Sequence, residues 1–200
     1  MVLFLFSLIL SCNTVSKKEA SKTDEDSPIT VKTSTDEKQV KETSKETFLC
    51  TINGKDWAYT KASGIISKDR KTNKRMALMT FTKKLEKGSE SIQLRYDADS
   101  FELLIASIQL RFKSKEGKPF TCYYELFPDT KKKSPNATMV GSIDLSSSST
   151  ASGNAEITNL SIKYESEKLK DPKNAIINVS GLEFSAVGYS DVDKLANTFK

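Results

Sequence analysis

The sequence offers few of the side chains that usually perform catalysis, and it contains no histidine. That absence excludes Ser-His-Asp and Cys-His catalysis, histidine-ligated zinc and histidine pH switches. Asp97, Asp99 and Glu102 form the densest acidic cluster after residue 47, and two carboxylates in a cleft can hydrolyse a glycosidic bond. These acids flank a turn that we expect between two strands, a position in which aspartate is common. We therefore predict that the protein is not an enzyme.

Patterns that bind metals, cofactors or nucleic acids are incomplete. Asp191 and Asp193 have the spacing of a calcium-binding loop, but no glycine or distal glutamate completes it, so we expect solvated acids and no metal. The sequence lacks a glycine-rich phosphate loop, a Gly-x-Ser-x-Gly motif and a Cys-x-x-Cys pair, so we expect no cofactor. The lysines at 131–133 are typical of a solvated loop and have no interleaved aromatic residues, so nucleic acid is not an expected partner.

Two cysteines within the aromatic-rich part of the chain occupy similar positions in alternating segments. Cys50 shares a strand face with Phe48 and Ile52, and Cys122 shares one with Phe120 and Tyr124. Both thiols should therefore point toward the core. In an oxidising compartment this arrangement predicts a Cys50–Cys122 disulfide, and the alternative is a pair of buried free thiols.

The third cysteine follows an apolar run at residues 2–10, which is about half the ~20 residues that a membrane-spanning helix needs. Such a run is typical of the apolar region of a secretory signal, and the alternative is a buried strand with a structural cysteine. Residues 13–47 contain no glycine and no aromatic residue, and their polar composition predicts disorder.

The region 48–200 has the alternation and turn signals of an all-β domain. Asn53-Gly54 is a strong signal for a hairpin, and Trp57 on the returning strand is expected in the core. The apolar alternation slips by one residue at Asn159 and again at Gly181, which predicts two β-bulges. About nine strands in all predict an antiparallel β-sandwich or a small barrel, with a short helix near 99–106 as an alternative for one strand.

Ser11-Cys12 after the apolar run resembles a bacterial lipobox, which implies a signal peptide at 1–11, a lipidated Cys12 and a disordered linker at 12–47. The opening Asn53-Gly54-Lys-Asp-Trp57 and the closing Ser-Gly181-x-x-Phe-Ser are similar to motifs of small, uncharacterised bacterial envelope lipoproteins. This resemblance implies an all-β domain and structural roles for Asn53, Gly54, Trp57 and Gly181. It also implies a membrane as partner through the lipid anchor, in the cell envelope.

Asn13 after the cysteine lacks the acidic retention signal of enterobacteria and so favours the outer membrane. The leading functional hypothesis is a non-enzymatic binding or structural domain whose protein or ligand partner is unknown. The alternatives are a lipocalin-like carrier of small hydrophobic ligands and a hydrolase that uses carboxylates alone. An apolar cavity would favour the carrier, two facing carboxylates would favour the hydrolase, and a filled core would favour the first hypothesis.

Overall fold

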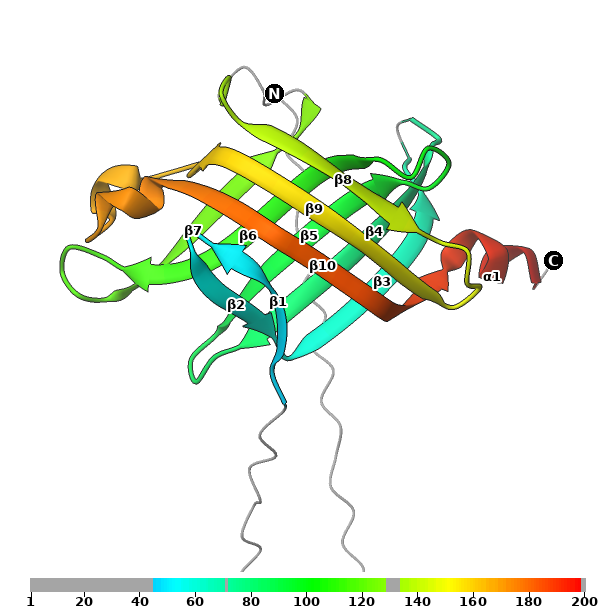
Figure 1. The fold of residues 1–200 in the computed structure, drawn as a ribbon, viewed down its shortest axis with the longest axis horizontal. Coiled ribbons are helices and arrows are strands. Elements are labelled where there is room, and N and C mark those ends of the chain that lie inside the picture. Colours follow the sequence, from blue (N-terminus) through cyan, green and yellow to red (C-terminus); the bar gives the residue numbers. More distant parts are fainter. Residues whose placement is uncertain (1–44, 71, 129–133, 199–200) are drawn as a thin grey trace, which may run out of the picture. The chain divides into compact units, whose positions relative to one another are not determined.

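The computed structural model describes residues 45–70, 72–128 and 134–198, with side chains as far as Leu195. These residues form ten β-strands, two 3₁₀ helices and one short α-helix, which confirms the predicted all-β domain (Figure 1). The predicted signal peptide, Cys12, the linker as far as residue 44 and the lysines at 131–133 lie outside the described residues. No helix in the described part of the chain is long and apolar enough to cross a membrane.

The strands follow one another along the chain with short connections. Their bounds are β1 (Thr47–Ile52), β2 (Lys55–Tyr59), β3 (Lys61–Lys68), β4 (Arg75–Lys84), β5 (Ser89–Asp97), β6 (Leu103–Lys113), β7 (Pro119–Leu126), β8 (Thr138–Asp144), β9 (Thr150–Ser161) and β10 (Ile176–Asp191). Between β9 and β10 lie the 3₁₀ helices η2 (Ser166–Lys168) and η3 (Pro172–Ala175), and α1 (Val192–Thr198) follows β10.

All ten strands belong to one sheet, with the order β2-β1-β10-β3-β4-β5-β6-β7 and a branch in which β9 pairs with β10 and β8 pairs with β9. Every pairing is antiparallel except that of β10 with β3, which is parallel. The described strands therefore form a mixed sheet that is not closed into a barrel, which corrects the small-barrel alternative. In Figure 1, β8, β9 and β10 cross in front of the layer formed by β3 to β7, an arrangement like that of a sandwich.

The space between these two layers is filled by large side chains. Phe184 on β10 packs against Phe81 on β4 and Tyr96 on β5, with ring centroids 5.2 and 6.3 Å apart. The Tyr96 hydroxyl donates a hydrogen bond to the backbone oxygen of Asn154 on β9, 3.0 Å away. The core is thus a packed interior held by aromatic contacts across the layers.

The predicted hairpin at the start of the domain is confirmed. Asn53 and Gly54 have φ values of 49° and 74°, as the two central residues of a type I′ turn require. The Asn53 side chain also holds the turn against β10. Its Nδ2 donates to the backbone oxygen of Ile176 (3.1 Å), and its Oδ1 accepts the backbone N–H of Asn178 (2.8 Å). The hairpin of β1 and β2 is therefore attached to the sheet at its tip.

Both predicted bulges are present in the β9–β10 pair, and the structure adds a third there. The register of β9 and β10 shifts next to Asn159 (φ 54°) and next to Gly181 (φ 61°). The additional shift lies between Phe184 and Val187, around Ala186 with φ 52°. The bulge at Asn159 lies in β9, and those at Gly181 and Ala186 lie in β10. The two in β10 bend this 16-residue strand, which pairs with β9 along its length and meets β1 at one end and β3 at the other.

Two expectations need correction. The segment near 99–106 is not a helix, because β6 begins at Leu103 after a turn. The strand β3 was not predicted, because its sequence KASGIISK has little apolar alternation. The structure explains why residue 64 of β3 is a glycine: a Cβ there would lie 2.7 Å from the Cβ of Tyr189 on the parallel neighbour β10. A residue needed for close strand packing therefore weakened the strand signal.

Candidate functional site

The residues of the Asn-Gly-Lys-x-Trp motif lie around an opening that we call the hairpin cleft. It has a volume of about 150 Å³ and lies between the tip of the β1–β2 hairpin, one end of β5 and β6, and η3. Its apolar lining comes from β1, β2 and β6, and its polar side chains come from the hairpin, β5 and η3. The lining residues are Ile52, Asn53, Lys55, Asp56, Trp57, Glu90, Leu110, Phe112 and Asn174.

Two residues that line the hairpin cleft, Trp57 and Glu90, are hydrogen-bonded to each other. Trp57 is 5% exposed, which confirms its predicted burial, and its Nε1–H donates to Glu90 Oε2 at 2.9 Å. The other carboxylate oxygen of Glu90 accepts the backbone N–H of Arg111 on β6, also at 2.9 Å. Glu90 therefore joins β2, β5 and β6, and its two oxygens are both engaged.

The importance of Glu90 was missed from the sequence, although a signal exists. Glu90 is in phase with Ile92, Leu94 and Tyr96, which are all buried, so its side chain belongs to the inward face of β5. A single charged residue on an apolar face needs a partner, because burying an unpaired carboxylate is costly. The partners are the Trp57 indole and a backbone amide, which makes this pair part of the framework of the cleft.

At the end of β5, Asp97 of the predicted acidic cluster closes a turn. Asp97 is 8% exposed, and its Oδ1 accepts the backbone amides of Asp99 (2.9 Å) and Ser100 (3.1 Å). These two hydrogen bonds, aided by Lys74 at 3.9 Å, hold the pKa of Asp97 below its usual value. The Asp97 carboxylate is thus used by the turn that the sequence predicted between two strands.

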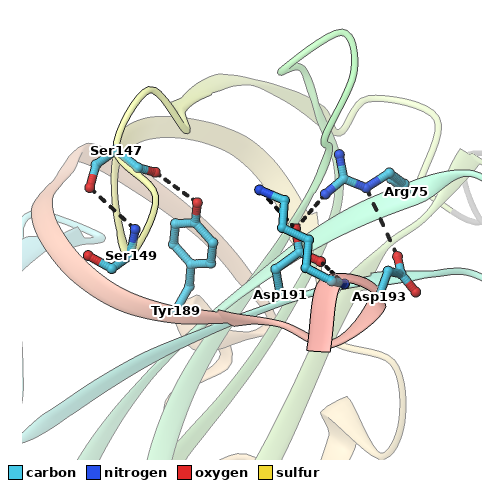
Figure 2. A network of polar contacts seen from close by, with 7 residues as sticks. Arg75, Ser147, Ser149, Tyr189, Asp191 and Asp193 are labelled. Atoms are coloured by element: carbon cyan, nitrogen blue, oxygen red, sulfur yellow. Dashed lines mark hydrogen bonds and ion pairs between the residues drawn. The ribbon is translucent and has the colours of Figure 1, made fainter. Parts of the chain in front are cut away.

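Asp191 is not the solvated acid that the sequence analysis predicted. It is 9% exposed, and Figure 2 shows that its carboxylate faces Arg75, whose Nη2 lies 2.7 Å from Oδ2. Lys194 lies 3.6 Å from the same oxygen, and Asp193 lies 4.0 Å from Arg75 Nε. The parallel pairing of β10 with β3 explains the change, since it brings the end of β10 beside the start of β4.

This network holds the end of the described chain to the sheet. The Asp191 Oδ1 accepts the backbone N–H of Lys194 at 3.2 Å, in the manner of a helix cap for α1. Two residues earlier in β10, the Tyr189 hydroxyl donates to the backbone oxygen of Ser147 at 2.8 Å (Figure 2). No group of three or more metal-ligating side chains was found among the described residues, which include Asp191 and Asp193.

The predicted Cys50–Cys122 disulfide is not formed, because both cysteines are buried free thiols. The strand register pairs Cys50 with Trp57 on β2 and Cys122 with Leu110 on β6, so the two thiols belong to different strand pairs. Burial raises the pKa of Cys50 to about 12, with a further increase from Glu156, and burial raises the pKa of Cys122 to about 11. Protonated, buried thiols of this kind are poor nucleophiles.

The structure brings three of the sequence-predicted residues, Asn53, Gly54 and Trp57, into the β1–β2 hairpin, and Asn53 and Trp57 line the hairpin cleft. It places Gly181 in a bulge of β10. No family model, no curated protein and no solved structure matches the chain.

Proposed function

We propose that this protein is a lipid-anchored component of a bacterial cell envelope whose β domain is a non-enzymatic binding module. The anchor is supported by the apolar run at 2–10, the lipobox-like Ser11-Cys12 and the polar composition of 13–47. Within the domain, three carboxylates already have partners. Glu90 accepts the Trp57 indole N–H, Asp97 accepts backbone amides of the turn that follows it, and Asp191 pairs with the guanidinium of Arg75. These engagements favour binding over hydrolysis.

The observation that carries the binding role is the filled interior. Tyr96, Phe81 and Phe184 occupy the space between the layers, where a carrier of the lipocalin type would hold its ligand. The hairpin cleft, at about 150 Å³, is smaller than the roughly 300–1,000 Å³ typical of small-molecule pockets. A partner of this domain is therefore expected on its surface, and the carrier of hydrophobic ligands is the less favoured function.

The anchor is tested on the full chain produced in a bacterial host. The wild type is expected to enter the detergent phase with a mass that starts at Cys12 and includes a diacylglycerol and a further acyl chain. Each buried methylene adds roughly 0.8 kcal/mol, so two or three chains hold the protein on a membrane. Cys12→Ser is expected to stay in the aqueous phase. Equal partitioning and no lipid mass on the wild type would refute the anchor.

The binding role is tested against the carrier alternative on the same protein. Lipids bound to the purified chain are extracted with organic solvent and identified by mass spectrometry, after removal of the covalent anchor at Cys12. A surface-binding module is expected to release no stoichiometric ligand. A stoichiometric apolar ligand, lost in a Leu110→Trp variant that fills the hairpin cleft, would establish the carrier function instead.

A further inference from the structure

The outer face of β5, β6 and β7 has a hollow of about 290 Å³, which we call the sheet-face hollow. Its outward-facing side chains alternate with buried ones such as Ile92, Leu94 and Tyr124, so the hollow lies on the side of the sheet opposite the core. The outward residues are Ser91, Gln93, Arg95, Ser107, Gln109, Tyr123, Glu125 and Phe127.

The strand register arranges these side chains in two rows across three strands. Gln93, Ser107 and Glu125 form one row, and Ser91, Gln109 and Tyr123 form the next. Most are amides or hydroxyls, which donate and accept hydrogen bonds without carrying charge. Tyr123 is 44% exposed and adds an amphipathic ring at the edge strand β7. Hydroxyls and amides beside an exposed aromatic ring are the groups that suit a sugar, which has both hydroxyls and apolar ring faces.

The sheet-face hollow contains two charged residues, Arg95 and Glu125, and only the charge of Glu125 is neutralised by an ion pair. Glu125 lies 2.5 Å from Lys163 Nζ. Arg95 is exposed and, within the described part of the chain, forms no ion pair or hydrogen bond through its side chain. A free guanidinium is suited to a carboxylate, which it binds with two parallel hydrogen bonds. Residues 48–200 contain 24 basic and 18 acidic residues, and this net positive charge also favours an acidic ligand.

The spacing of Arg95 and Tyr123 bears on the size of the ligand. Arg95 on β5 and Tyr123 on β7 are two strand spacings apart and are offset by four residues along the strands. On a regular sheet this corresponds to a diagonal of ~17 Å. A ligand that contacts both is an extended chain of several units. We infer that the sheet-face hollow binds a carboxylate-bearing polysaccharide, with Arg95 on a uronate carboxylate, Gln93 and Gln109 on hydroxyls, and Tyr123 stacked on a sugar ring. This inference rests on the proposed binding function and names its ligand class.

The test uses the full chain and isothermal titration with hexamers of galacturonate, guluronate, mannuronate and hyaluronan, each beside its methyl ester. We expect at least one acid hexamer to bind with a Kd of about 1 mM or lower and its ester to bind at least tenfold more weakly. Arg95→Gln and Tyr123→Ala should each weaken binding at least tenfold, whereas Tyr123→Phe retains it. Arg70→Gln, an exposed arginine that does not line the hollow, is the matched control and should bind like the wild type.

Several outcomes would overturn the inference. The first is that no acid hexamer of the panel binds, and the second is that Arg95→Gln leaves binding unchanged. The third is that inorganic phosphate competes with the hexamer at equal concentration, which would indicate a general anion site. A photoreactive residue at position 123 that crosslinks an envelope protein and no glycan would assign the hollow to a protein partner. Detergent partitioning of the same samples separates the two proposals, because a protein that is anchored but does not bind these glycans refutes only the ligand class.

Discussion

The bond between Trp57 and Glu90 predicts that two distant positions contribute to stability as one unit. Trp57→Phe keeps an aromatic ring but removes the N–H that Glu90 Oε2 accepts at 2.9 Å. Glu90→Gln places an amide between two donors, the Trp57 indole and the Arg111 backbone, so one of the two loses its acceptor. Each change should therefore leave a buried or half-buried polar group without its partner.

The expected magnitudes follow from these contacts. A hydrogen bond to a charged group contributes about 1.5–3 kcal/mol, so each single variant should lower the free energy of unfolding by about 2 kcal/mol. The double variant removes both partners, and its loss should fall short of the sum by about 1–2 kcal/mol. Trp57→Ala removes a side chain that is 5% exposed and should cost about 3–5 kcal/mol. That is a large fraction of the ~5–15 kcal/mol typical of a domain.

The assay is urea unfolding followed by far-ultraviolet circular dichroism, since Trp57 is the single tryptophan of the chain and its variants lose tryptophan fluorescence. With a slope of about 2 kcal/mol per molar urea, Trp57→Ala should lower the midpoint by roughly 2 M. Additive losses for Trp57→Phe and Glu90→Gln, within ~0.3 kcal/mol, would refute the coupling. Tryptophan emission of the native wild type at the wavelength of hydrated indole would refute the burial itself.

Three further predictions concern the hairpin tip, the turn after β5 and the thiols. Asn53→Ala should cost about 1–2 kcal/mol more than Asn73→Ala in thermal unfolding, because both residues have positive φ but only Asn53 bonds through its side chain to β10; equal losses would contradict this. Because the pKa of Asp97 is lowered in the folded protein, its ionised carboxylate stabilises the fold at pH values above the unfolded-state pKa of about 3.9. This stabilisation is lost as the pH falls through the folded-state pKa, so the free energy of unfolding of Asp97→Asn should decline less in acid than that of the wild type. Parallel pH profiles of the two proteins would refute this prediction. Without reductant, Cys50 and Cys122 should resist iodoacetamide at pH 8 in the native protein and react fully in urea, as peptide mapping would show; protection that persists in urea until a reductant is added would reveal a disulfide.

Local signals predicted much of this fold. Asn53-Gly54 determines a turn through its own backbone preferences, and the slips at Asn159 and Gly181 appear as bulges because a change of face must be absorbed within one strand. The bulge at Ala186 was missed because alanine has no preference for positive φ, so only the surrounding sheet places it there. Strand β3 was missed because Gly64 serves a close approach to Tyr189, which is 125 residues away in the chain.

The candidate site was predicted less well, because its partners come from different strands. Trp57 was expected in the core, but nothing near it in the chain identifies Glu90 as its hydrogen-bond acceptor. The ion pair of Arg75 with Asp191 likewise depends on the parallel pairing of β10 with β3, which no local pattern encodes. The disulfide prediction was wrong for the same reason: two inward-facing cysteines were recognised, but the strands that carry them are paired with other neighbours.

The position of β10 has a consequence for the order in which the domain assembles. This strand is the last of the described chain, yet it pairs with β1, β3 and β9 and so joins the hairpin, the five-stranded layer and the β8–β9 pair. Contacts between residues as far apart as Thr51 and Ser180 form only when nearly the whole domain has been synthesised. An emerging chain therefore lacks the strand that unites its parts until synthesis of the domain is almost complete.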